Sequence, residues 1–152
     1  LISSTTKFVP DVAGEYIKEH SAPYERIIHS GHQDYGIFWH ADRKGLDGGI
    51  PDVEKIRYAE ENLNVTWIFM YQWGLQEMQN AEKWGYIKEN YHLAQFAFQQ
   101  GPQGPQAFYM LFRKGGKFNE SNINALLADK PIQIRTYEYT TGTVDLNYVD
   151  IE

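Results

Sequence analysis

Three histidines and an aspartate form the part of this sequence with the clearest potential for chemistry. His29 and His32 enclose a Ser-Gly pair, and His40 and Asp42 follow shortly after. Neutral imidazoles and a carboxylate from nearby turns can bind zinc or iron. Because the spacing lacks the tight pattern of known zinc motifs, we expect loop and strand-end residues here, with a free-standing metal-dependent enzyme as the alternative. We predict no catalytic, cofactor-binding or metal residue.

A charged loop follows the last of these histidines. Asp42, Arg43 and Lys44 stand directly before Gly45, which places one acid and two bases at the end of a helix or strand. Such a loop can hold an anionic ligand or pair with neighbouring groups. Since exposed charges are usually solvated, we expect pairing or anchoring of the loop.

Other patterns that carry chemistry are incomplete. The glycines of residues 45–49 lack the Lys-Ser/Thr pair of a phosphate-binding loop, and Ser30 lacks the Gly-x-Ser-x-Gly elbow of hydrolases. Glu60 and Glu61 are consecutive on a predicted helix, so they point in different directions and cannot serve one reacting centre. We interpret them as a solvated helix face.

Aromatic residues make up 15% of the chain, which implies a core or an interface rich in flat rings. Exposed tryptophans would favour another hypothesis, a carbohydrate-binding module. Its candidate residues are Trp39, Trp67, Trp73 and Trp84.

Alternating helices and strands must position these groups. Apolar residues at helical spacing predict a helix from Phe8 to His20, ended by Ser21-Ala22-Pro23. The next elements are a strand within 24–31, an ambiguous segment at 36–46, a helix from Asp52 or Val53 to Asn62, and a buried central strand at Val65–Tyr71.

The second half is predicted to be richer in strands. The expected elements are a helix from Gly74 to Asn90, an antiparallel pair at 91–98 and 107–113, a short helix at 120–129, and strands at 132–139 and 144–151, the last at a half-exposed sheet edge. The pattern predicts one α/β domain over 1–152, with a three-layer Rossmann-like sheet, flanking helices and a β-rich C-terminal hairpin. Residues 1–7 are expected to be a disordered or cloning-derived start, and 117–152 a C-terminal extension.

Composition limits the classes of partner. The 152 residues carry a net charge of -6 without a basic cluster, which argues against nucleic acid. The absence of cysteine excludes disulfides and thiolate metal sites. No apolar run approaches the ~20 residues that span a bilayer, so the fragment is expected to be soluble.

Several short segments together resemble a known family. They are Val12–Pro23, Arg26–Ile28, His40–Leu46 with its Ala-Asp-Arg-Lys-Gly run, and Asn64–Phe69. In their order and their short motifs, these segments resemble the soluble region that follows the last membrane span in polytopic glycosyltransferases related to the protein O-mannosyltransferases. The resemblance covers residues 8–113, and residues 117–152 have no counterpart in it.

The resemblance implies a non-catalytic accessory domain on the extracytoplasmic face of a membrane. In that family, sugar transfer from a lipid-linked donor depends on acidic residues in loops near the membrane, so no catalytic residue carries over to this chain. The implied partners are the transmembrane region of the parent chain and a sugar acceptor or lipid-linked donor. The absence of an initiating Met fits an excised piece or a processed chain.

Overall fold

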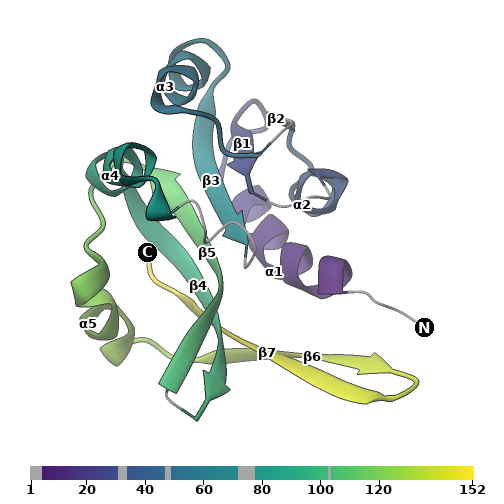
Figure 1. Ribbon diagram of the computed structural model, residues 1–152. Helices are drawn as coiled ribbons and strands as arrows, with labels where there is room; N and C mark the ends of the chain where they lie inside the picture. The colour runs from purple at the N-terminus through teal and green to yellow at the C-terminus, as the bar shows by residue number, and fades with distance from the viewer. Residues whose placement is uncertain (1–4, 31–33, 47–48, 72–77, 103) are drawn as a thin grey trace.

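The computed structural model describes residues 5–30, 34–46, 49–71, 78–102 and 104–152 (Figure 1). Helices and strands alternate through the first half, and strands dominate the second. In chain order the elements are α1 (Thr5–His20), β1 (Arg26–His29), α2 (Asp34–Ala41), β2 (Gly45–Leu46), α3 (Val53–Asn62), β3 (Val65–Tyr71), α4 (Ala81–Asn90), β4 (Tyr91–Gly101), β5 (Gly104–Lys114), the 3-10 turn η2 (Glu120–Asn122), α5 (Ile123–Ala128), β6 (Gln133–Tyr139) and β7 (Gly142–Asp150).

All the strands belong to one open sheet of mixed direction. The strand order is β2-β1-β3-β5-β4-β7-β6. β1 pairs in parallel with β2 and β3, because helical crossovers return the chain to the same end of the sheet. From β3 onward every pairing is antiparallel. The predicted α/β class is therefore confirmed, with a parallel part and an antiparallel part in one sheet.

The predicted central strand is confirmed as β3, which lies between β1 and β5. Its side chains are buried on both faces of the sheet, which is why the segment is almost continuously apolar. Trp67 and Phe69 belong to one apolar cluster, whereas Ile68 and Met70 belong to the other.

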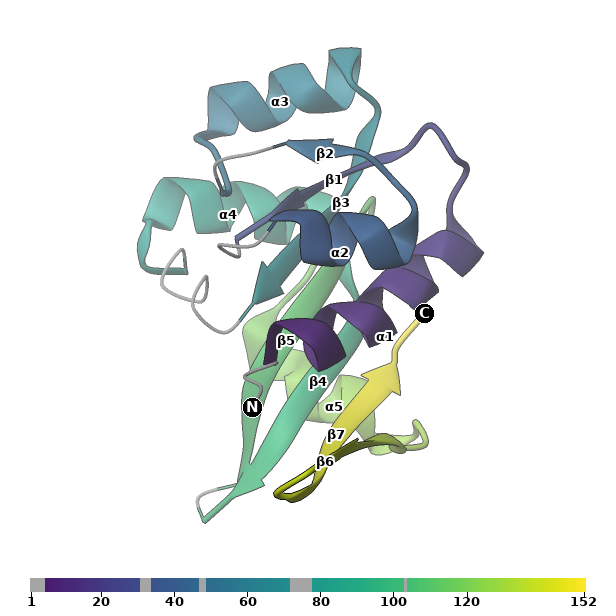
Figure 2. The ribbon, with the colours of Figure 1, turned by 90° about the vertical axis from the view of Figure 1, so that its right-hand side faces the viewer.

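These clusters give the sheet a core on each face. One contains residues of α1 and α2, and the other contains residues of α3 and α4 (Figure 2). Both extend along the sheet to the C-terminal strands, since Leu146 joins the first cluster and Val149 the second. Both cores therefore pack against the same sheet, one on each face.

Capping residues set the start of two helices. The Asp52 side chain accepts a hydrogen bond from the Lys55 backbone N–H at 3.1 Å, as predicted for α3. The Asn80 side chain does the same for Lys83, so α4 begins at Ala81. The prediction of one continuous helix from Gly74 was therefore wrong at residue 80, where the backbone is extended; residues 72–77 lie outside the described part of the chain.

The ambiguous segment 36–46 contains the end of α2 and then the short strand β2. α2 packs closely on α1 because Gly14 has no side chain: a Cβ there would lie 2.4 Å from the His40 Cβ and 2.8 Å from the Ala41 backbone nitrogen. Gly45 is constrained in a similar way by the Phe38 ring. Sequence periodicity does not reveal such close approaches.

The predicted C-terminal hairpin is confirmed as β6 and β7. The prediction that the last strand forms a sheet edge was wrong, because β7 pairs with β4 as well as with β6, which leaves β6 at the edge. Residues 117–152 are thus built into the sheet and core. At the other end α1 begins at Thr5, inside the segment 1–7 expected to be a disordered start; residues 1–4 lie outside the described part.

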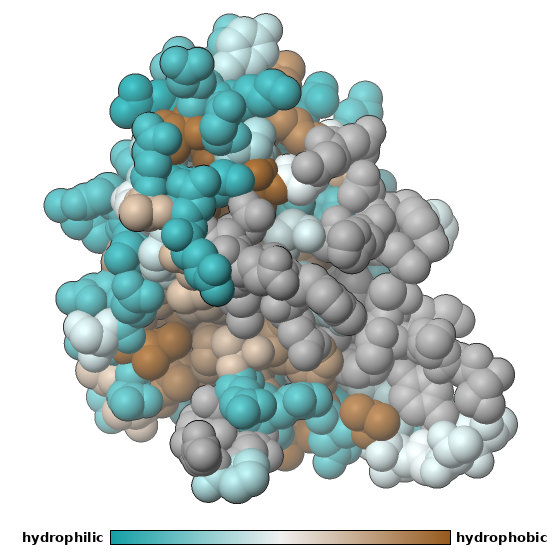
Figure 3. Space-filling view, in the orientation of Figure 1, coloured by the Kyte–Doolittle hydropathy of each residue, from teal (hydrophilic) through white to brown (hydrophobic). Residues whose placement is uncertain are grey.

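Hydrophilic side chains cover the surface over α3 and α4, and hydrophobic ones reach the surface near α5 (Figure 3). Within the described residues, no helix combines the length and apolar character needed to cross a membrane.

Candidate functional site

A hollow of about 1080 Å³ lies where the three parallel strands begin. Its wall includes Arg26 at the start of β1, Lys44 just before β2 and Asn64 just before β3. Backbone bonds hold these starts together: the Arg26 N–H donates to the Asn64 carbonyl at 2.9 Å, and the Ile27 N–H donates to the Lys44 carbonyl at 3.1 Å. The floor of the hollow is therefore formed by hydrogen-bonded strand starts.

Arg43 anchors the charged loop at the rim of this hollow. Its guanidinium donates to the carbonyls of Lys18 and Ser21 at the end of α1, at 3.2 and 2.9 Å. It also donates to the carbonyls of Ala41 and Asp42 at the end of α2, at 3.3 and 2.9 Å. The last carbonyls of a helix lack partners within the helix and carry partial negative charge, so one cation satisfies both helix ends.

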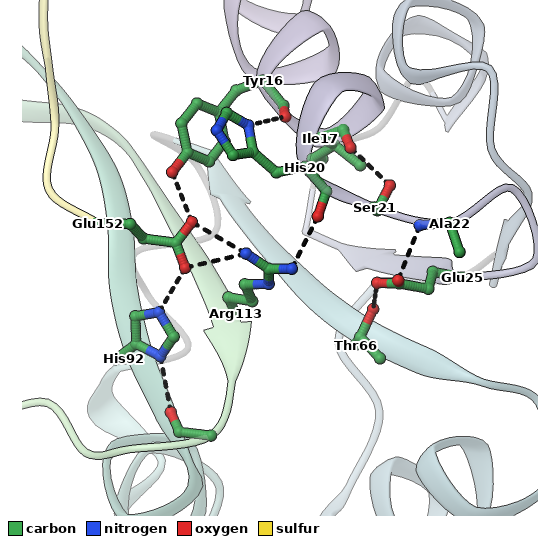
Figure 4. A network of polar contacts seen from close by, with 11 residues as sticks. Tyr16, Ile17, His20, Ser21, Ala22, Glu25, Thr66, His92, Arg113 and Glu152 are labelled. Atoms are coloured by element: carbon green, nitrogen blue, oxygen red, sulfur yellow. Dashed lines mark hydrogen bonds and ion pairs between the residues drawn. The ribbon is translucent and has the colours of Figure 1, made fainter.

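Three carboxylates line the hollow, and those of Glu15 and Glu25 are engaged, whereas the Asp42 side chain makes no hydrogen bond or ion pair with another described residue. Glu25 accepts from the Ala22 backbone N–H at 2.9 Å and from the Thr66 hydroxyl at 2.5 Å (Figure 4). Glu15 forms a two-pronged ion pair with Arg135 of β6, at 2.9 and 3.0 Å. Both acids thus bind parts of the fold together.

The cations of the hollow are in a different situation. The side chains of Lys18, Arg26 and Lys44 line it without a hydrogen bond or ion pair to any other described residue. The Arg43 charge is shared among neutral carbonyls, which leave it uncompensated. Four cations, those of Lys18, Arg26, Arg43 and Lys44, therefore line the hollow together with three carboxylates, those of Glu15, Glu25 and Asp42.

Two aromatic rings project at the same place. Trp39 of α2 is 77% exposed and Tyr24 in the turn before β1 is 67% exposed, and both line the hollow. Trp67 and Trp84 are buried in the two cores, and Trp73 lies outside the described residues. Of the tryptophans proposed for carbohydrate binding, Trp39 alone has a described side chain on the surface.

The histidines and the aspartate predicted as metal candidates do not assemble into a described site. His29 is buried at the carboxyl end of β1, with its ring edge-on to Phe38 at 5.0 Å between centroids. His40 and Asp42 line the hollow at the opposite end of that strand, and His32 lies outside the described residues. In the described ranges, no three His, Asp or Glu side chains gather closely enough to hold a metal ion.

A second polar cluster joins the end of the chain to the rest of the molecule (Figure 4). The Glu152 carboxylate accepts from the Tyr16 hydroxyl at 2.5 Å, from His92 Nε2 at 2.7 Å and from Arg113 at 3.2 Å. Arg113 also donates to the His20 carbonyl at 2.7 Å and lies over the Trp67 ring. No local sequence pattern indicates this cluster, because its members come from α1, β4, β5 and the segment after β7.

Charge and burial compete at Glu152. Burial by itself raises the pKa of this carboxyl, but hydrogen bonds from Tyr16 and His92 and the charge of Arg113 together hold its pKa below the usual range. The other His92 nitrogen, Nδ1, lies 2.8 Å from the Gly115 carbonyl. Both ring nitrogens of His92 therefore face oxygen atoms, which fixes the orientation of the ring.

Glu60 is a buried carboxylate, contrary to the expected solvated helix face. Its side chain is 5% exposed and accepts from the hydroxyls of Tyr86 and Tyr91, each at 2.6 Å. Burial, followed by the bond to Glu60, raises the pKa of Tyr86 to about 12 and raises that of Tyr91 further. These contacts fasten α3 to α4 and β4, a structural role.

Comparison with known proteins adds no relative: no family model, curated protein or solved structure matches the chain significantly.

Proposed function

We propose that this chain is a non-catalytic accessory domain on the extracytoplasmic face of a membrane glycosyltransferase-like protein. In this proposal the domain supports the catalytic membrane body of its parent chain, or the contact with a sugar acceptor or lipid-linked donor. The parallel strands with their helices would then be the three-layer, Rossmann-like part of the domain, and the antiparallel strands an addition to it.

One observation carries the proposal. Every segment behind the family resemblance sends a side chain to the same hollow: Pro23 from the first, Arg26 from the second, Arg43 from the third and Asn64 from the last. Residues far apart in the chain thus build one surface. A shared surface is what a domain needs in order to dock on a larger body.

The chemistry of the hollow favours docking over catalysis. Glu25 accepts two hydrogen bonds and Glu15 is paired with Arg135, so neither carboxylate is poised as a general acid or base. Arg43 is held by backbone carbonyls. Glu15, Glu25 and Arg43 therefore hold parts of the fold together.

The test compares the isolated chain with its intact parent protein. The purified 152-residue chain should fold and transfer no sugar from a lipid-linked donor, whereas the intact parent transfers it under the same conditions. The gene upstream of Leu1 should encode apolar spans of about 20 residues. Sugar transfer by the isolated chain, or a gene without such spans, would contradict the proposal.

The exposure of Trp39 favours carbohydrate binding as a second candidate function. An indole face beside polar groups can stack on a sugar ring. Titration with neutral sugars would then quench or shift the Trp39 fluorescence, and the Trp39→Phe variant would lose that response.

A further inference from the structure

The hollow at the start of the parallel strands has unbalanced charge. Lys18, Arg26 and Lys44 have no side-chain partner among the described residues, while Glu15 is paired with Arg135, which it shares with Asp11. The lining holds four cations, counting Arg43, and three carboxylates, counting Glu25 and Asp42, so the excess is positive but small. The whole chain is acidic, with a net charge of -6, so this cationic region departs from the average surface. Because charges beyond about 10 Å are screened at ordinary salt, the local excess decides which partner is attracted.

The exposed rings add a second property to the same region. Trp39 and Tyr24 are amphipathic side chains, each with an apolar ring and a polar N–H or O–H. Such rings gather at membrane–water interfaces, at the depth of the lipid headgroups. Cations beside them reach lipid phosphates, and each basic side chain near an anionic surface strengthens binding.

We infer that this hollow and its rim, formed by Lys18, Tyr24, Arg26, Trp39 and Lys44, bind the surface of an anionic phospholipid bilayer. The inference rests on the proposed function. It names an anionic bilayer as the partner of the hollow, the surface to which the segments that carry the family resemblance contribute. Trp39 and Tyr24 would enter the headgroup layer, and the cations would pair with phosphates. Arg43 would hold the loop in place, since its donors are already engaged.

A neutral sugar explains these observations less well than a bilayer does. Sugar recognition requires hydrogen-bonding groups in fixed positions, whereas the Lys18 and Lys44 side chains are held by no described contact. A neutral sugar also leaves the excess positive charge unmatched. A bilayer of anionic lipid offers phosphates to the cations and a headgroup layer to the exposed rings, over one broad area.

Vesicle binding tests the inference directly. The purified chain is mixed with vesicles of phosphatidylcholine plus phosphatidylglycerol, or of phosphatidylcholine alone, and bound protein is measured by sedimentation. We expect binding to the anionic vesicles, weaker binding to the neutral ones, and loss of binding at high salt. Trp39 fluorescence should move to shorter wavelength in the bound state, because the ring leaves water.

Matched variants locate the surface. Trp39→Ala and Lys44→Ala should each weaken binding by about fivefold or more. Tyr58→Ala and Lys55→Ala change an exposed ring and an exposed cation of α3, which lie outside the hollow, and should leave binding unchanged. All these side chains are exposed, so circular dichroism should show the same fold for every variant.

Three outcomes would overturn the inference: no binding of the unaltered chain to anionic vesicles, equal loss in the α3 variants, or binding of a neutral sugar that Trp39→Ala abolishes. The last result would make the hollow a carbohydrate site. Failure here is distinct from failure of the proposed function, since apolar spans in the parent and absence of transfer by the chain are measured separately.

Discussion

At the scale of single residues, charged side chains join elements that are distant in sequence. Glu152 connects the C-terminal segment to α1, β4 and β5, and Arg43 connects the ends of α1 and α2. Each contributes through several hydrogen bonds to a charged group, which are stronger than bonds between neutral groups. Single substitutions at these positions should therefore have measurable effects on stability.

Glu152→Gln should lower the free energy of unfolding at neutral pH by about 1 kcal/mol, because it removes the charge from three hydrogen bonds in a partly solvated cluster. Urea denaturation measures the loss. Glu61→Gln, on an exposed helix position, is the matched control and should change little. An equal effect of both variants would show that the Glu152 cluster contributes nothing to the free energy of unfolding.

The same carboxylate gives stability a defined pH dependence. Its pKa is lower in the folded chain than its ordinary value of 4.5, so on acidification the unfolded chain takes up the proton first. Its contribution is complete above pH 4.5 and is lost as the pH falls through the folded pKa. The stability difference between the unaltered chain and Glu152→Gln should therefore shrink in acid; a constant difference down to complete protonation would contradict this assignment.

Arg43→Lys should cost about 1–2 kcal/mol of unfolding free energy, since an ammonium cannot bridge two helix ends as a planar guanidinium does. Arg26→Lys is the matched control, because the Arg26 side chain makes no hydrogen bond or ion pair with another described residue. Thermal denaturation of both variants measures the difference. Equal stability of the two would mean that the Arg43 contacts contribute no net stability.

At the scale of elements, the crossing of α1 and α2 depends on one missing side chain. Gly14→Ala should destabilise the chain by about 1–3 kcal/mol, because the new methyl group would overlap His40 and the Ala41 backbone. Gly85→Ala, inside α4 with open space around it, should instead stabilise the chain by about 0.5–1 kcal/mol. Chemical denaturation of the pair separates helix propensity from helix packing, and a stabilising Gly14→Ala would refute the close contact.

At the scale of the whole molecule, the C-terminal strands and the N-terminal helices share a core. Leu146 of β7 is completely buried in the cluster that contains Ile17 of α1 and Trp67 of β3. Leu146→Ala should cost about 2–4 kcal/mol, and Val144→Ala, at an exposed site on the same strand, much less. Circular dichroism and tryptophan fluorescence should report one shared unfolding transition, whereas separate transitions would mean that residues 117–152 form an independent unit.

The elements that the sequence predicted well are those with strong local patterns. Val65–Tyr71 is a nearly unbroken apolar run, Asp52 is a standard helix cap, and the turn at residues 140–141 separates two alternating segments. The start of α4 was predicted too early, because the apolar spacing continued past the capping Asn80. The edge position of the last strand was also wrong, since alternation alone cannot say which strand pairs on its outer side.

The sequence by itself determined the α/β class, most of the helices and strands, and the absence of thiol chemistry, because these follow from short-range periodicity and composition. Only the tertiary structure decided that β7 lies between β4 and β6, that Glu60 is buried, and that Arg43 caps two helices. The hollow likewise exists only in three dimensions, where Tyr24 and Trp39 line the same surface. Contacts between residues far apart in the chain depend on strand order and helix crossing, which no local pattern encodes.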